Sequence, residues 1–307
     1  MAIDLGGTRT KLGLVQGERI LRTDEMDSQA SFGLLDRLPE IVTRLNALLE
    51  ESALSIDDVI GVGIAIPGIV DTLENKVLVI NDKFGDAPQI DFVRWASSSW
   101  GLRVRLENDA RAALLGEWRF GVGRGFDNVV QMTLGTGIGT SAVMDGHLLR
   151  GKHYQGGILG GHFIINQNGP LCNCGNVGCA EAQASTWNLG RLITSHDLYK
   201  QSSLAHHNSF DFKLIFHQAE QGDALARIVR DECLEAWATC ALNLVQAYDP
   251  ELLILGGGVM RSHKHIIPHI QRKLDQNGWG TWGNVNVVQA SMLNSAALLG
   301  VASLLDN

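Results

Sequence analysis

The chain has 307 residues, a length typical of two domains of roughly 150 residues each. Hydrophobic residues make up 45% of it and charged residues 19%, which is enough apolar material for a large core. The net charge of −8 is opposite to the basic footprint of a nucleic-acid-binding protein. No apolar run reaches the roughly 20 residues that span a bilayer, and the N-terminus lacks the basic and apolar regions of a signal peptide. We therefore expect a cytoplasmic protein that binds neither nucleic acid nor membranes.

The predicted elements alternate short β-branched or glycine-rich runs with longer helical stretches, which is typical of an α/β fold. In the first half, the patterns predict a hairpin over residues 1–22, a helix over 33–53, strands over 59–66 and 103–106, and a helix over 110–118. In the second half, they predict strands over 129–134, 141–144, 147–149 and 252–255, and helices over 231–248 and 295–305. Residues 196–222 are polar, and we expect an irregular surface excursion there.

One unit occurs twice in this order: a strand, a turn rich in glycine and threonine, and a second strand. The two turns begin at Gly6 and Gly135, so the unit returns after about 129 positions. A solenoid would repeat every roughly 20–50 residues, so this distance predicts two similar domains instead. The boundary between them, near residues 115–125, follows from the repeat alone.

The first turn reads Asp4-Leu5-Gly6-Gly7-Thr8-Arg9-Thr10-Lys11. Its glycines expose backbone N–H groups and its threonines add hydroxyl donors, which together suit phosphate oxygens. Asp4 can hold a hydrated Mg²⁺ beside them. The second turn, Gly135-Thr136-Gly137, offers another cradle, so two facing hairpins would clamp one polyphosphate. For each turn on its own, a plain hairpin is the alternative.

The segment Glu107-Asn108-Asp109 follows a predicted strand and precedes a predicted helix. Aspartate at such a place commonly caps the helix, and the spacing alone favours this interpretation. In the functional alternative, Asp109 is a general base, because the positive end of the helix keeps it ionised and ready to accept a hydroxyl proton. Asn108 would then orient the same substrate.

Three of the five cysteines lie close together and follow a histidine, in the pattern His162-x9-Cys172-x-Cys174-x4-Cys179. Clustered thiols in a reducing compartment indicate metal ligands rather than a disulfide framework. Three thiolates and one imidazole form a closed tetrahedral zinc site of the structural kind. Because all four ligands come from the protein, no open position is left for a zinc-dependent hydrolase.

Together these motifs resemble the ROK (repressor, open reading frame, kinase) family of the actin-like sugar-kinase superfamily. The resemblance covers nearly the whole chain, through residues 4–11, 61–71, 107–118, 134–151, the zinc loop with Glu181-Ala182, and 249–259. It implies two actin-like (ribonuclease H-like) α/β domains with a cleft between them. The N-terminal domain would take residues 1–118 plus 295–307, and the C-terminal domain, with the zinc loop, residues 119–294.

The same resemblance implies a glucokinase-like enzyme that uses ATP and Mg²⁺ to phosphorylate a sugar, and a homodimer. ATP would lie between the two turns, and the implied ATP contacts are Asp4, Gly6, Gly7, Thr8, Thr10, Lys11, Gly135, Thr136 and Gly137, with Gly256, Gly257 and Gly258 near the adenosine. The implied sugar contacts are Gly68, Asn108, Asp109, His162 and Glu181. Asp109 would be the base, and His162 would link the zinc to the sugar pocket.

Residue 159 departs from the family pattern. The family usually has Glu-x-Gly-His before the zinc loop, whereas this chain has Leu159-Gly160-Gly161-His162. A carboxylate that binds sugar hydroxyls is thus replaced by leucine. A second hypothesis is therefore a sugar-binding or regulatory protein that has lost most turnover, although the intact Asp109 and phosphate turns favour a kinase. Which sugar is used, a hexose or an N-acetylhexosamine, stays open.

Repressors of this family carry a helix-turn-helix domain ahead of the first phosphate turn. Here that turn begins at Asp4, and the sequence before it has no room for such a domain. We therefore expect a kinase rather than a transcriptional repressor.

Overall fold

The computed structural model describes residues 1–80, 83–279, 283, 285–292 and 295–306. The chain forms two compact units. The first consists of Met1–Gly125, Arg150–Gly156 and Ser291–Asn307, and the second of Phe126–Leu149 and Gly157–Ala290. Each unit has a five-stranded mixed sheet packed with helices, so the predicted α/β class is confirmed. Among the helices formed by the described residues, none combines the length and apolar character needed to cross a membrane.

The sheet of the first unit has the order β3-β2-β1-β4-β7. These strands are β1 (Ala2–Leu5), β2 (Arg9–Gln16), β3 (Arg19–Asp27), β4 (Val62–Ile66) and β7 (Val104–Asn108). β1 is parallel to β4, and β4 is parallel to β7. The carboxyl ends of these three strands therefore meet at one edge of the sheet, which is where ligands bind in many α/β folds.

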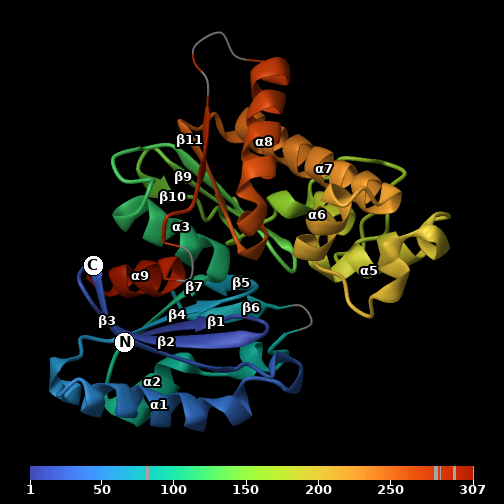
Figure 1. The fold of residues 1–307 in the computed structure, drawn as a ribbon. Helices are drawn as coiled ribbons and strands as arrows, with labels where there is room; N and C mark the ends of the chain where they lie inside the picture. The colour runs from blue at the N-terminus through green and yellow to red at the C-terminus, as the bar shows by residue number, and fades with distance from the viewer. Residues whose placement is uncertain (81–82, 280–282, 284, 293–294, 307) are drawn as a thin grey trace. The chain divides into compact units, whose positions relative to one another are not determined.

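Helices cover both faces of this sheet (Figure 1). On one face lie α1 (Leu38–Glu51) and α2 (Phe92–Trp100), and on the other lie α3 (Asp109–Phe120) and α9 (Ala296–Ala302). A small two-stranded sheet, β5 (Ile69–Asp71) and β6 (Lys76–Val79), follows β4. The helix predicted over residues 33–53 begins only at Leu38, because Gly33 has a φ of +100° and two short 3₁₀ turns, η1 (Ala30–Phe32) and η2 (Leu35–Arg37), precede it.

Helices α3 and α9 pack closely because each presents a glycine to the other. A methyl group at Gly300 would overlap the carbonyl oxygen of Ala112, and one at Gly116 would overlap that of Ala296. The carboxyl-terminal helix thus belongs to the first unit, and its packing fixes the helix that begins at Asp109.

The sheet of the second unit has the order β10-β9-β8-β11-β12. Its strands are β8 (Val129–Leu134), β9 (Ile138–Met144), β10 (His147–Leu148), β11 (Leu252–Gly256) and β12 (Asn286–Gln289). In both units an antiparallel hairpin is joined to a parallel strand, β2-β1-β4 in the first and β9-β8-β11 in the second. This is the repeated unit that the sequence predicts.

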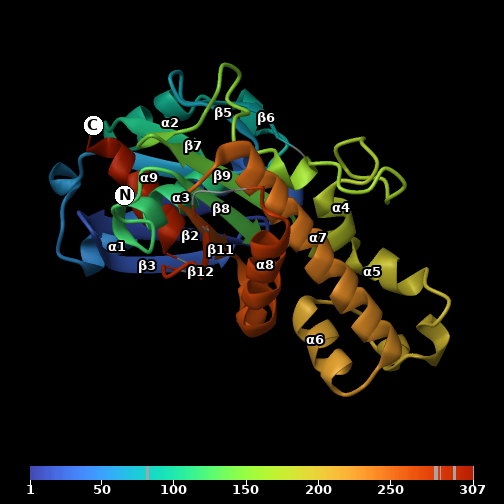
Figure 2. The same ribbon diagram turned by 90° about the horizontal axis from the view of Figure 1, so that it is seen from above.

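The helices of the second unit are α4 (Ala180–Ala184), α5 (Thr186–Thr194), α6 (Phe212–Glu220), α7 (Ala224–Tyr248) and α8 (His263–Asn277). Figure 2 shows α5 and α6 beside α7. The prediction of an irregular surface excursion over residues 196–222 is wrong, because α6 lies within it and packs Phe212, Ile215 and Phe216 into the core. Its apolar residues follow helical spacing over nine positions only, and the polar residues on either side obscure that short pattern. Helix α7 also begins earlier than predicted, at Ala224.

Candidate active site and metal centre

The first phosphate turn joins β1 to β2 and is held closed from two sides. The N–H of Gly6 donates to the carbonyl of Arg9 at 3.1 Å. Ser28, directly after β3, donates its hydroxyl to the Gly6 carbonyl at 2.6 Å and its N–H to the Thr8 carbonyl at 3.1 Å. The buried Thr10 hydroxyl lies 3.0 Å from that of Ser28, so Thr10 stabilises the turn while Thr8 is exposed. The sequence analysis missed Ser28, which only the pairing of β2 with β3 brings to the turn.

Asp4 lies near the carboxyl end of β1, opposite Lys11 in β2. Burial is the main cause that raises the pKa of Asp4 to about 6; the charge of Lys11 opposes the rise, and the charge of Asp109 adds to it. The carboxylate is therefore mostly ionised at neutral pH. A partly buried carboxylate beside a turn of backbone N–H groups fits a hydrated Mg²⁺, which prefers one or two carboxylates plus phosphate oxygens.

Asn108 joins the ends of two neighbouring strands. Its amide nitrogen donates to the carbonyl of Gly68 at 3.0 Å, and its amide oxygen accepts from the N–H of Arg111 at 3.2 Å. Asn108, rather than Asp109, is thus the N-cap of α3. Gly68 has a φ of +99°, and a methyl group there would overlap the carbonyl of Val79, so only glycine fits this turn. The structure brings Gly68, Asn108 and Asp109 to the same edge of the sheet as Asp4.

Asp109 is the first residue of α3. One of its carboxylate oxygens accepts from the N–H of Ala110 at 2.8 Å and from the Asn108 side chain at 3.1 Å. Burial raises the pKa of Asp109, and the Ala110 hydrogen bond, the charge of Lys83 and the Asn108 hydrogen bond oppose that rise. A carboxylate with a raised pKa is a stronger base than an exposed one and stays ionised above that pKa. The sequence analysis missed Lys83.

A buried ionic network lies directly before Asn108. Glu107 has no exposed surface, and its carboxylate lies 3.5 Å from the guanidinium of the equally buried Arg111. Arg150 donates twice to the other oxygen of Glu107, at 3.0 and 2.8 Å. The Asn108 N–H donates to Glu107 as well, at 3.0 Å, so the pair of residues that precedes Asp109 is tied to the Arg150–Gly156 loop. The sequence offered one signal for this ionic network, which is that Glu107 and Arg111 lie four positions apart.

In the second unit, Glu181 supports the second phosphate turn. Its carboxylate accepts from the N–H of Ile138 at 2.8 Å, and a methyl group at Gly137 would lie 2.5 Å from the same oxygen. The hydroxyl of Thr186 donates to the Gly135 carbonyl at 3.0 Å, which holds the other end of the turn. The structure thus places Glu181, predicted as a sugar ligand, against this turn with one oxygen already engaged.

The second glycine cluster follows β11, which is parallel to β8, so the exposed Thr136 and the run Gly256–Gly258 share one edge of this sheet. Gly257 has a φ of +92°, and a methyl group there would overlap the carbonyl of Leu134. A methyl group at the neighbouring Gly258 would meet nothing within 4 Å, so the backbone there is open.

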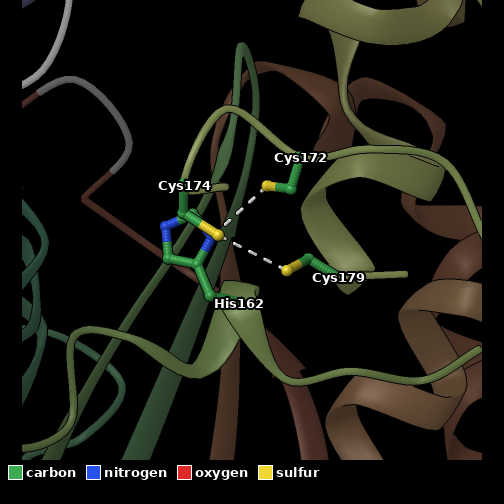
Figure 3. Close-up of side chains that lie close together, drawn as sticks. All are labelled: His162, Cys172, Cys174 and Cys179. Carbon is green, nitrogen blue, oxygen red and sulfur yellow. Dashed lines mark hydrogen bonds between the residues drawn. The ribbon is translucent and has the colours of Figure 1, made fainter. Parts of the chain in front are cut away.

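The four predicted metal ligands converge (Figure 3). The ligand atoms of His162, Cys172, Cys174 and Cys179 all lie within 4.8 Å of one another. Cys172 Sγ is 3.6 Å from His162 Nδ1, and Cys174 Sγ is 3.6 Å from Cys179 Sγ. A tetrahedron with Zn–S bonds of about 2.3 Å has edges of about 3.8 Å, so the donor set and its spacing fit Zn²⁺.

The zinc loop takes its shape from two left-handed glycines. Gly175 and Gly178 have φ values of +90° and +81°, and a methyl group at Gly178 would overlap the carbonyl of Asn166. Burial raises the pKa of the Cys179 thiol to about 12, so a metal has to displace its proton on binding. Among the described residues, this is the one group of three or more His, Cys, Asp or Glu side chains that is arranged for a metal ion.

Leu159 precedes the short 3₁₀ helix η5 (Gly160–His162), which ends at the zinc ligand. Gly160 and Gly161 are buried, and a methyl group at Gly161 would overlap the Ile138 carbonyl. The Leu159 side chain, by contrast, is 41% exposed. Leu159 therefore exposes an apolar side chain to solvent three residues before the predicted zinc ligand His162.

Comparison with known proteins gives three findings. A glucokinase of Thermotoga maritima is 34% identical over 312 residues, which cover 99% of this chain and 96% of that protein. A ROK family glucokinase from Streptomyces griseus, solved in complex with glucose and AMPPNP, superposes with a TM-score of 0.77 at 29% identity and covers 98% of this chain and 97% of that one. The xylose repressor of Bacillus subtilis strain 168 is 28% identical over 246 residues, 80% of this chain and 60% of that protein.

The fold is that of the ROK kinases, which consists of two actin-like domains of mixed α/β structure. The model of the ROK family matches residues 1–307. The resemblance carried by the turns, the Asn108-Asp109 pair and the zinc loop is therefore confirmed: this chain belongs to the ROK family.

Proposed function

We propose that this chain, an ATP-dependent sugar kinase, phosphorylates a hydroxyl group of a hexose or an N-acetylhexosamine, with Asp109 as the general base. The observation that supports this proposal is the placement of Asp109. A carboxylate with a burial-raised pKa begins α3, at the same sheet edge as Asp4 and the first phosphate turn. A base and a phosphate cradle at one edge are what phosphoryl transfer to a hydroxyl requires.

In the reaction, Asp109 accepts the proton of the sugar hydroxyl. The hydroxyl oxygen forms a bond to the γ-phosphorus of ATP while the bond from that phosphorus to the β–γ bridging oxygen breaks, and ADP leaves. Asn108 holds Asp109 in place through its 3.1 Å hydrogen bond. Asp4 would hold Mg²⁺, which supplies positive charge to the phosphate oxygens. Most of the rate then comes from positioning and charge stabilisation, which the turn and these side chains provide.

His162, Cys172, Cys174 and Cys179 would hold one structural zinc ion, which contributes folding free energy to its loop. The loop leads directly into α4, whose first turn contains Glu181. We assign sugar contacts to Glu181, His162, Asn108 and Gly68, and ATP contacts to the two glycine turns and Gly256–Gly258. The family resemblance implies a homodimer. Light scattering, which measures the mass of the protein in solution, tests this.

The experiment is a coupled ADP-release assay of the purified protein with ATP and Mg²⁺. The panel contains hexoses, amino sugars and N-acetyl sugars, and a reaction without sugar measures background ATP hydrolysis. We expect sugar-dependent ADP release with at least one member of the panel. If no sugar raises ADP release above the background, the proposed kinase activity is wrong.

A sugar-binding regulatory protein with little turnover is the second candidate. Leu159 favours it, because an exposed leucine stands where the family usually has a sugar-binding glutamate, and the similarity to a xylose repressor supports it too. Calorimetric titration of the same sugars separates the two candidates. Tight sugar binding without any ADP release would identify the regulatory protein.

A further inference from the structure

Lys83 lies against the first phosphate turn. A methyl group added at Gly7 would lie 2.5 Å from Lys83 Cε and 2.7 Å from Lys83 Nζ. The lysine side chain therefore occupies the space beside the Gly7 backbone, with its ammonium group at the turn. A side chain at residue 7 would displace the Lys83 side chain from this position.

The backbone next to Lys83 is anchored to the first unit. Phe84 is fully buried, and its N–H donates to the carbonyl of Ala30 at 2.7 Å. Two residues further, the Asp86 carboxylate accepts from the N–H groups of Leu34 and Leu35 at 2.6 and 2.8 Å. The Lys83 side chain thus extends toward the turn from a fixed point.

The charge of Lys83 has no close partner in the part of the chain that the structure describes. None of the ion pairs of these residues includes it, and the side chain is half-buried. Its ammonium does act on Asp109, where it opposes the burial-driven rise in pKa. A half-buried ammonium group at the phosphate turn, outside the ion pairs of the described residues, is suited to bind an anionic ligand group.

We propose that Lys83 binds the γ-phosphate of ATP and stabilises the charge that develops on it during transfer. This inference rests on the proposed kinase function. The group that moves must pass from the nucleotide at the Gly6-Gly7 turn to a hydroxyl at Asp109. The Lys83 ammonium lies at that turn, and its charge acts on Asp109. The hydroxyl proton goes to Asp109, and ADP is the leaving group. Charge placed where the transition state develops it is a large contribution to phosphoryl transfer.

The test compares Lys83→Met, Lys83→Arg and the matched control Lys76→Met, an exposed lysine in β6. Methionine keeps the apolar stem that covers Gly7 but removes the charge, so the melting temperature should stay close to that of the parent. Titration calorimetry measures the affinity of each variant for AMPPNP and for ADP, both with Mg²⁺, and the ADP-release assay measures kcat.

We expect Lys83→Met to bind AMPPNP about 10- to 100-fold more weakly than the parent, the range of a charge-assisted hydrogen bond, and to bind ADP as tightly as the parent. Its kcat should fall by about 10²-fold or more. Lys83→Arg should recover part of both losses, and Lys76→Met should match the parent. With the opposing charge of Lys83 gone, the acid limb of the kcat–pH profile should also move to higher pH.

Equal weakening of AMPPNP and ADP, or no weakening of either, would overturn the γ-phosphate contact and leave Lys83 as a residue that covers Gly7. These binding measurements need no turnover. A parent without sugar-dependent ADP release therefore counts against the proposed kinase function, while the ratio of the two nucleotide affinities still decides the role of Lys83.

Discussion

Replacing Asp109 with asparagine separates the chemical role of this residue from a structural one. The amide has the shape of the carboxylate, and its oxygen can still accept from the Ala110 N–H and the Asn108 side chain, which the structure places at 2.8 and 3.1 Å. What asparagine cannot do is take the hydroxyl proton. Loss of a general base costs roughly 10²–10⁴ in rate, which corresponds to about 2.7–5.4 kcal/mol of transition-state stabilisation.

The same substitution should not lower stability. Because burial raises the pKa of Asp109, folding disfavours its ionised form, and the contribution of this group to stability falls as the pH rises through the raised pKa. A neutral amide removes that penalty. At pH 8, Asp109→Asn should therefore melt at or above the temperature of the parent while its kcat is lower by two to four orders of magnitude. For the parent, kcat/KM should fall as the pH drops through the raised pKa of Asp109.

Asp91→Asn is the matched control, since Asp91 is a true N-cap whose carboxylate accepts from the Arg94 N–H at 2.9 Å. Asparagine caps a helix about as well as aspartate, so this variant should keep both the kcat and the melting temperature of the parent. The assay is ADP release over pH 5–9, together with thermal unfolding. If Asp109→Asn behaves like Asp91→Asn, or melts earlier while it keeps its rate, the general-base mechanism is wrong.

Four further predictions address the rest of the molecule. Metal analysis of protein purified without chelators should find about one zinc ion per chain. The variant Cys172→Ser should lose the zinc ion together with several kcal/mol of stability. A parent protein that is folded and contains no metal would contradict the proposed zinc site. Leu159→Glu should raise kcat/KM for ordinary hexoses about 10- to 100-fold, because the new carboxylate can accept a hydrogen bond from a sugar hydroxyl. The same substitution should lower kcat/KM for the sugar that the parent prefers. An unchanged profile on the sugar panel would mean that Leu159 does not face the sugar. Gly300→Ala should lower the free energy of unfolding, measured with denaturant, by about 3 kcal/mol because its methyl group overlaps a carbonyl of α3. The control Gly85→Ala places its methyl group in open space and should change this free energy little. Equal losses in the two variants would contradict the close packing of α3 and α9. Asp4, with a pKa raised from 3.8 to about 6, binds its proton more tightly in the folded state, so the ligand-free parent should lose about 2 kcal/mol of stability between pH 4 and pH 6 relative to Asp4→Asn. Parallel stability curves would show that burial does not shift this group.

The sequence predicted those parts of the site whose geometry is local. A glycine turn between two strands, a helix start after Asn108 and a metal loop closed within 18 residues, from His162 to Cys179, all depend on residues that are near one another in the chain. Spacing alone could not distinguish the cap from the base, because aspartate serves both purposes at a helix start. The structure gives the cap to Asn108 and places Asp109 at the first helical position, so the cap interpretation does not hold for Asp109.

The parts that the sequence did not predict depend on tertiary packing. Lys83 reaches the first turn across 76 positions of the chain, and Arg150 reaches Glu107 across 43. Neither lies in a periodic or glycine-rich pattern, so no local rule indicates a partner. The Arg150–Gly156 loop, which belongs to the first unit although the residues on both sides of it belong to the second, leaves no signal in composition either.

The zinc loop connects stability to the second phosphate turn through a short chain of contacts. Cys179, one of the four proposed zinc ligands, is also the N-cap of α4, and Glu181 lies in the first turn of that helix. The Glu181 carboxylate in turn accepts the Ile138 N–H at the end of the Gly135–Gly137 turn. Displacing the zinc loop would therefore disturb the carboxylate that holds the turn, since Glu181 lies only two residues after Cys179. The proposed zinc ion would thus support the second turn through Cys179 and Glu181 without taking part in the chemistry.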